Sequence, residues 1–209
     1  MAAGLWKTFA ASAVATALGL ACLLQATALG NAFTTETLRR TEVANAPALV
    51  PDLAVHDAAG HGSTLRQLLA AGERVWIIDF VYTRCQTVCT TLGSVFQQLQ
   101  LQIQERGLDG RVGLLSVSFD PAHDTADSLK AYGDRMRMDP AIWRVVTLSS
   151  ALDRRELLDA FGIMVIPAPL GEFEHNAALH LVTASGMLVR IIDYDDARRA
   201  LETALGVNP

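Results

Sequence analysis

The sequence predicts an α/β domain built around a mixed sheet, because buried strands alternate with amphipathic helices along most of the chain. Residues 75–82 and 111–120 are largely apolar and rich in β-branched side chains, which is typical of strands buried on both faces. Between them, residues 90–107 place apolar side chains at helical spacing and end at a glycine. Strands that alternate with helices in this way predict an α/β sandwich with a central mixed sheet.

The remaining elements extend this unit at both ends. Upstream we predict a hairpin over residues 51–64 and a short helix capped by Ser63 and ended by Gly72. The elements expected downstream are a helix capped by Thr125, a strand at 143–148, a helix at 149–162, two strands within 177–193 and a final helix at 196–206. This order is that of a thioredoxin-like sandwich with a central mixed sheet and an added N-terminal hairpin.

The N-terminal segment is apolar and has no charge from residue 8 to residue 30. A helix needs about 20 residues to cross the apolar core of a bilayer, so residues 1–30 are expected to be a single transmembrane anchor or a signal helix. The small-x-small pattern at residues 26–28 keeps the signal alternative open. In both cases the remainder is exported, with residues 31–50 as a polar spacer and 51–209 as the folded domain.

Charge and composition argue against nucleic-acid binding. The 209-residue chain has a formal net charge of −5 and a pI near 5.5, and its sequence shows no basic run and no Gly-rich phosphate loop. A nucleic-acid partner is therefore not expected. Of the three cysteines, Cys22 falls inside the apolar N-terminal segment, where it would be a small apolar side chain.

The other two cysteines, Cys85 and Cys89, lie where the first buried strand gives way to a helix. If the helix starts between them, the sulfurs can approach one another and the helix N-terminus favours the thiolate form. A structural disulfide would close a very short loop and add little stability. A redox dithiol and a metal site remain open, and two soft thiolates favour Cu(I), with zinc as the usual competitor.

A metal site would need a further ligand, and the five histidines are the obvious source. His56 and His61 fall in the predicted hairpin, and His123 in a loop, where exposed side chains are the ordinary expectation. His180 lies within a strand and is expected to be buried. His175 immediately precedes that strand, and in a thioredoxin-like fold this region adjoins the start of the cysteine-bearing helix. We therefore expect His175 to be the third ligand.

Three stretches, in order, resemble the SCO/SenC family of copper-binding, thioredoxin-like proteins. They are DFVYTRCQTVCTTL with the two cysteines, LLSVSFDPAHDTADSLKAY with the D-P-x-x-D-T pattern, and EHNAALHLVTASGMLVRIID with a histidine strand and hairpin. The family's metal-binding histidine falls on His175 rather than His180. The chain departs from the family at Thr90, where proline often follows the second cysteine.

The resemblance implies a metallochaperone rather than an enzyme, with Cys85, Cys89 and His175 binding Cu(I) and possibly Cu(II). Such a protein delivers copper to, or matures, the binuclear copper site of cytochrome c oxidase subunit II or another copper-receiving protein. The alternative is a thiol-disulfide reductase that acts through Cys85 and Cys89 on cysteines of the recipient. The family is anchored in the inner membrane, with the domain in the periplasm or the intermembrane space. Asp120 and Asp124 match the D-P-x-x-D-T pattern and are interpreted as turn-forming and helix-capping residues, with a supporting role beside the metal site as the alternative.

Overall fold

The computed structural model describes residues 2–27, 34–85, 88–169 and 172–208, and it leaves out the side chains of residues 2–5 and 88–91. The chain divides into two compact units, Met1–Asn45 and Ala46–Pro209. We describe each unit by itself.

The first unit contains two helices, α1 (Ala2–Ala26) and α2 (Thr35–Asn45). Within the described part of the chain, the 21-residue stretch Trp6–Ala26 of α1 is the helix long and apolar enough to cross a membrane. This is consistent with the expected anchor. The polar segment expected as a spacer is partly helical, because α2 occupies it.

The second unit is built on a mixed eight-stranded sheet of order β1-β10-β9-β4-β5-β6-β2-β3. β4, β5 and β6 run parallel and the other neighbours are antiparallel, so the sheet is mixed, as predicted. The strands are β1 (Ala48–Leu49), β2 (Ala54–Asp57), β3 (Gly62–Thr64), β4 (Val75–Val81), β5 (Val112–Ser118), β6 (Trp143–Leu148), β9 (Ala178–Val182) and β10 (Met187–Asp193).

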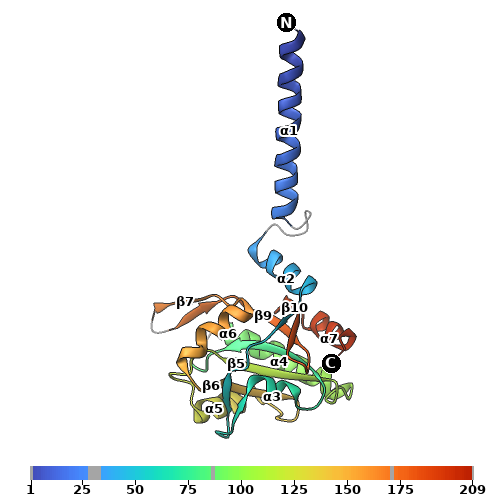
Figure 1. Ribbon diagram of the computed structural model, residues 1–209. Coiled ribbons are helices and arrows are strands. Elements are labelled where there is room, and N and C mark those ends of the chain that lie inside the picture. Colours follow the sequence, from blue (N-terminus) through green and yellow to red (C-terminus); the bar gives the residue numbers. More distant parts are fainter. Residues whose placement is uncertain (1, 28–33, 86–87, 170–171, 209) are drawn as a thin grey trace. The chain divides into compact units, whose positions relative to one another are not determined.

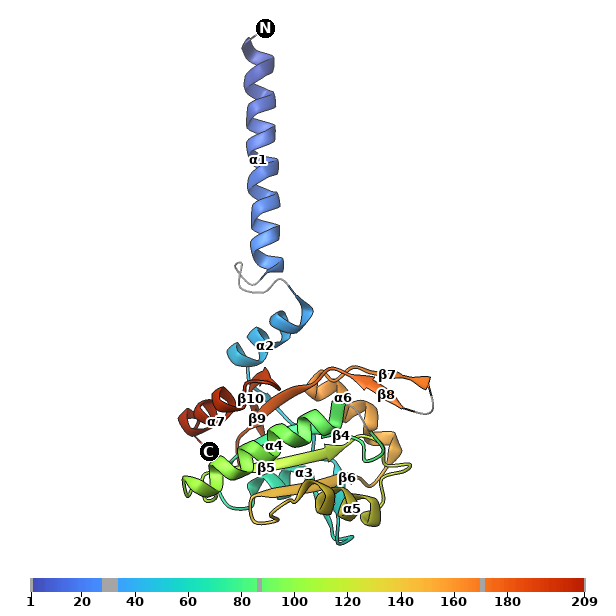
Figure 2. The same ribbon diagram turned by 180° about the vertical axis from the view of Figure 1, so that it is seen from behind.

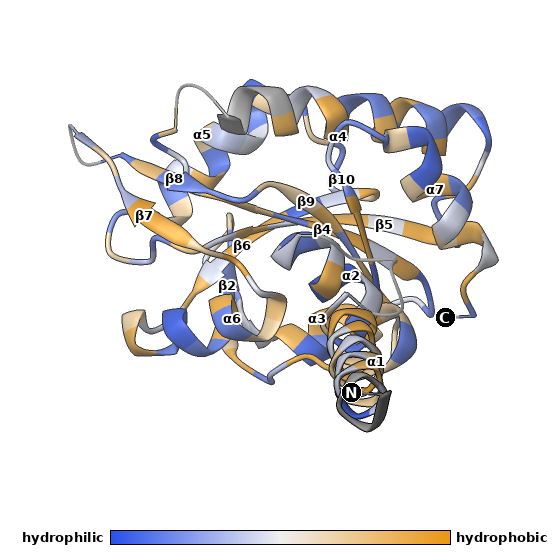
Figure 3. Ribbon diagram, turned by 90° about the horizontal axis from the view of Figure 1, so that it is seen from above, coloured by the Kyte–Doolittle hydropathy of each residue, from blue (hydrophilic) through white to orange (hydrophobic). Residues whose placement is uncertain are grey.

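Helices cover both faces of this sheet. The helices are α3 (Leu65–Ala70), α4 (Val88–Glu105), α5 (Ala126–Met136), the short 3-10 helix η1 (Ala151–Asp153), α6 (Arg154–Phe161) and α7 (Ala197–Gly206). Figures 1 and 2 show the sheet between them, and Figure 3 shows α4, α5 and α7 on one face with α3 and α6 on the other. The polar and apolar residues that alternate along α4 in Figure 3 match its predicted amphipathic pattern.

Two local expectations need correction. The cap of α3 is Thr64 rather than Ser63, because Thr64 forms a reciprocal capping box with Gln67. The segment between the predicted helix at 149–162 and β9, for which the sequence predicts no strand, forms a second, two-stranded sheet of β7 (Val165–Pro167) and β8 (Phe173–His175). These strands have only three residues each, too few for an alternating pattern to identify them.

Gly113 in β5 lies against a fully buried indole, and this contact leads to the first testable prediction. A Cβ atom at this position would lie 2.8 Å from the Trp76 ring and from Arg74 Cδ. Gly113→Ala should therefore lower the free energy of unfolding by about 1–3 kcal/mol, the usual cost of overpacking a core. Urea unfolding should show this loss. Gly110→Ala is the matched control because its Cβ would meet nothing within 4 Å, and an equal loss in both variants would contradict the steric explanation.

Candidate metal centre

Cys85 follows β4 in a tight turn, in which its backbone N–H donates to the carbonyl of Tyr82 at 3.2 Å. The residue is 8% exposed. Helix α4 begins at Val88, so it starts between the two cysteines, as expected, and Cys89 lies in its first turn. The side chain of Cys89 is outside the described part of the structure.

The segment before Cys85 is held by Asp124, a residue that is 1% exposed. One oxygen of its carboxylate accepts the backbone N–H of Thr83 at 3.0 Å, and the other accepts the Thr83 hydroxyl at 2.6 Å. The Ser118 hydroxyl donates to the same carboxylate. Asp124 therefore fixes the approach to the thiol, whereas α5 is capped by Thr125. The helix-capping interpretation of Asp124 is thus wrong.

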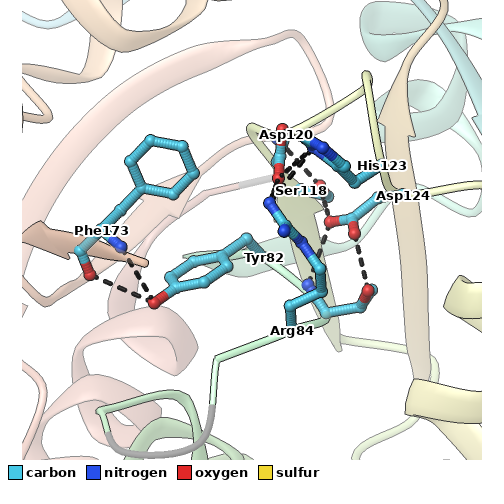
Figure 4. Close-up of polar contacts among 8 residues, drawn as sticks. Tyr82, Arg84, Ser118, Asp120, His123, Asp124 and Phe173 are labelled. Carbon is cyan, nitrogen blue, oxygen red and sulfur yellow. Dashed lines mark hydrogen bonds and ion pairs between the residues drawn. The ribbon is translucent and has the colours of Figure 1, made fainter. Parts of the chain in front are cut away.

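Asp120 holds the next residue of the same segment, Arg84, as Figure 4 shows. The Arg84 guanidinium donates to the buried Asp120 carboxylate at 2.9 Å. Nδ1 of His123 lies 3.0 Å from the same carboxylate. Burial by itself would raise the pKa of Asp120, but the hydrogen bonds and charges of His123 and Arg84 lower it below its ordinary value. The positive charge of Arg84 is therefore paired with Asp120.

His175 is the last residue of β8, and its half-buried ring packs edge-on against Phe119 with centroids 5.3 Å apart. Nδ1 lies 3.4 Å from the carbonyl oxygen of Asn176. A carbonyl can only accept, so this contact assigns the proton to Nδ1 and the lone pair to Nε2. Nε2 is buried and has no hydrogen-bond partner among the described residues.

Burial lowers the pKa of His175, while the Asn176 carbonyl and the charge of Cys85 act in the opposite direction. The imidazole is therefore held in the neutral form that binds metals. Cys85 and His175, two of the three expected ligands, thus interact electrostatically although they come from separate parts of the chain.

His180 is buried and His61 is exposed, as expected. His180 is fully buried on β9, with its ring packed edge-on against Phe80 and Phe161 at centroid distances of 5.3 and 5.6 Å. The side chain of His61 is 82% exposed beside Asp57. Within the described side chains, which exclude that of Cys89, no three His, Cys, Asp or Glu residues converge on one point. The three-ligand set stays a prediction.

Sequence reasoning missed the aromatic residues that surround His175. Tyr82, Phe119 and Phe173 contact one another with centroid distances of 5.3–5.8 Å, and the Arg154 guanidinium lies 4.8 Å from the Phe173 ring centroid. Phe173 lies in the unpredicted strand β8. The sequence therefore gave no signal that these rings meet.

The chain is similar to known proteins over most of its second unit: a family model described as SCO1/SenC matches residues 51–206. A Bacillus subtilis (strain 168) protein, described as an SCO1 protein homolog, is 26% identical over 123 residues, which cover 58% of this chain and 62% of that protein.

Solved structures confirm the thioredoxin-like fold. BsSco, described as a member of the Sco family of cytochrome c oxidase assembly proteins with a disulfide switch, superposes with a TM-score of 0.61 at 21% identity, covering 77% of this chain and 95% of that one. Yeast Sco1 with copper bound gives a TM-score of 0.63 at 17% identity, covering 78% and 92%. At these identities the likeness supports the fold alone.

Proposed function

Because the chain belongs to the SCO1/SenC family, we propose that it is a membrane-anchored metallochaperone whose cargo is copper. The observation that supports this most directly is the lone pair on the buried Nε2 of His175, which has no hydrogen-bond partner among the described residues. A buried nitrogen without a partner is costly unless something binds it. The nearby Cys85 supplies a soft ligand, and yeast Sco1 is a copper-bound protein of similar fold.

The proposed site consists of the Cys85 and Cys89 thiolates and the His175 imidazole around one Cu(I). Thiolates are soft ligands that favour Cu(I), and a neutral imidazole completes a three-coordinate shell without adding charge. Both thiols must lose their protons to bind. The position of Cys89 in the first turn of α4 assists this, because unpaired N–H groups at a helix N-terminus stabilise a thiolate.

The proposed recipient is the binuclear copper site of cytochrome c oxidase subunit II, or another copper-receiving protein of the same compartment. Copper would leave by ligand exchange with the recipient's own cysteines and histidines. The α1 helix would anchor the chain in the inner membrane, with the domain in the periplasm or, in a mitochondrion, in the intermembrane space. Oxidation of the two cysteines to a disulfide would remove both sulfur ligands and so block binding.

A second candidate is a thiol-disulfide reductase that acts on cysteines of the recipient. The disulfide switch of BsSco favours retaining it, because the same pair of sulfurs could exchange with a partner's disulfide. The two functions differ in their need for His175, which a dithiol exchange does not use.

Anaerobic Cu(I) titration of the full-length chain in detergent micelles tests the copper proposal. Cys22 is exposed on α1, so the Cys22→Ser background restricts binding to the other two cysteines. In competition with a chromophoric Cu(I) chelator, the chain should bind one ion, and Cys85→Ser should abolish binding. His175→Ala should weaken affinity more than about tenfold, since even groups that only orient a ligand contribute about 10–100-fold.

His61→Ala is the matched control, because this exposed imidazole lies in the hairpin of β2 and β3. It should leave the affinity unchanged. Tight binding that survives both Cys85→Ser and His175→Ala would overturn the site. Reduction of an oxidised partner that continues with the chelator present, and that is indifferent to His175→Ala, would favour the reductase.

A further inference from the structure

Tyr82 links the polypeptide before Cys85 to the strand of His175. It is 1% exposed and follows directly after β4. Its hydroxyl donates to the Phe173 carbonyl at 3.2 Å, and its oxygen accepts the Phe173 N–H at 3.2 Å. Figure 4 shows this hydroxyl pointing at the backbone of β8, on the side of the ring away from Asp120 and Asp124.

The two ends of this link are close in sequence to two expected ligands. Tyr82 is three residues before Cys85, and Phe173 is two residues before His175. Within the described strands, β8 pairs with β7 alone and makes no ladder with the eight-stranded sheet. Apart from the two-residue connection from His175 to β9, side-chain contacts position β8 against that sheet, and Tyr82 supplies two hydrogen bonds for this purpose.

Ring packing also holds β8, and a substitution can distinguish its contribution from that of the Tyr82 hydroxyl. The Tyr82 ring packs on Phe173 and Phe119, and Phe119 packs on His175. A phenylalanine at position 82 would keep these ring contacts and lose only the oxygen. The oxygen bonds directly to the backbone of β8, so its loss should act on the position of that strand.

We propose that the Tyr82 hydroxyl is a positioning group, which fixes β8 and thereby sets the distance of His175 from the cysteine sulfurs. Tyr82 does not touch the cargo; it acts through His175. The part of this inference that concerns copper rests on the function proposed above, and the part that concerns the strand does not.

The test compares Tyr82→Phe with the unaltered full-length chain in detergent micelles, first without metal. The Phe173 amide should exchange with solvent at least about tenfold faster in the variant, because its acceptor is gone. The contact between the His175 and Phe119 rings, measured by nuclear Overhauser effect, should weaken. Tyr132→Phe removes the same atom from another buried tyrosine, on α5, and should change neither signal.

The second readout is a double-mutant cycle on Cu(I) affinity. Tyr82→Phe removes both hydrogen bonds to Phe173 and should weaken binding about five- to tenfold, because part of the energy of these bonds, each worth about 1 kcal/mol, is transmitted to the position of His175. In the His175→Ala background the same change should have no further effect, since the group that Tyr82 positions is absent. Unchanged Phe173 exchange would overturn the proposal, and so would an equal loss of affinity in both backgrounds. If no variant binds copper, the proposed function fails, and Phe173 exchange decides the role of Tyr82 alone.

Discussion

At pH 8, Asp79→Asn should stabilise the second unit by roughly 4 kcal/mol. Asp79 is fully buried in β4, opposite Ser116 of β5. Burial raises the pKa of its carboxyl from 3.8 to about 7, against a smaller lowering by the Ser116 hydroxyl. Because one pKa unit corresponds to about 1.4 kcal/mol, holding this group ionised in the folded state has a cost of that order. Asparagine has nearly the same shape and never ionises.

The two pKa values of Asp79 define the pH range of the effect. Below 3.8 both the folded and the unfolded state keep the proton. Between 3.8 and about 7 only the folded state keeps it, so stability falls as the pH rises. Above about pH 7 the loss of stability is complete. The difference between Asp79→Asn and the unaltered chain should therefore be small near pH 4 and full near pH 8.

Urea unfolding of the full-length chain in micelles, followed by the fluorescence of the buried Trp76 and Trp143, measures this difference. Asp195→Asn makes the same substitution at an exposed position and is the matched control. A stability difference for Asp79→Asn that is constant between pH 4 and pH 8 would contradict the explanation.

Asp124→Ala should have the second largest effect, a loss of about 3 kcal/mol or more in the free energy of unfolding. The change leaves the Thr83 N–H, the Thr83 hydroxyl and the Ser118 hydroxyl without their shared acceptor in a buried place. Each such group costs about 1–3 kcal/mol when it stays unsatisfied. Because Thr83 lies two residues before Cys85, the thiol should also become more accessible.

Two measurements check the expected result for Asp124→Ala. Urea unfolding gives the loss of stability, and the alkylation rate of Cys85, identified by mass spectrometry, gives its accessibility. Asp127→Ala is the control, since it removes an exposed aspartate from the first turn of α5. If Asp124→Ala loses stability while Cys85 alkylates at the unaltered rate, Asp124 stabilises the fold without holding the approach to the thiol.

Much of the fold could be predicted because its elements have long, regular patterns. β4 and β5 are buried at every position, so their sequences are largely apolar, with Asp79 and two serines as the polar exceptions. α5 begins at a residue with a clear local cause, the Thr125 cap, and α6 ends at one, the left-handed Gly162. These causes act within a few residues, and a single sequence shows them directly.

The candidate site could be predicted only in its residue types. The spacing of Cys85 and Cys89 indicates two sulfurs at the start of a helix, and this local fact is independent of the rest of the fold. The choice of His175 over His180 rested on where a strand of this fold class would lie and on a family resemblance. His180 proves to be packed edge-on against two phenylalanine rings, whereas the sequence predicted its burial but not these neighbours.

The sequence by itself determined the long buried strands, the amphipathic helices of the second unit, the apolar N-terminal segment and the two cysteines at the start of α4. The tertiary structure alone decided that Tyr82 bonds to Phe173, that Asp124 bonds to Thr83, and that the Nε2 of His175 is left without a partner among the described residues. These pairs are separated by 91 and 41 positions along the chain. Periodicity and capping extend over only a few residues, so contacts between such distant segments exist only once the sheet has brought them together.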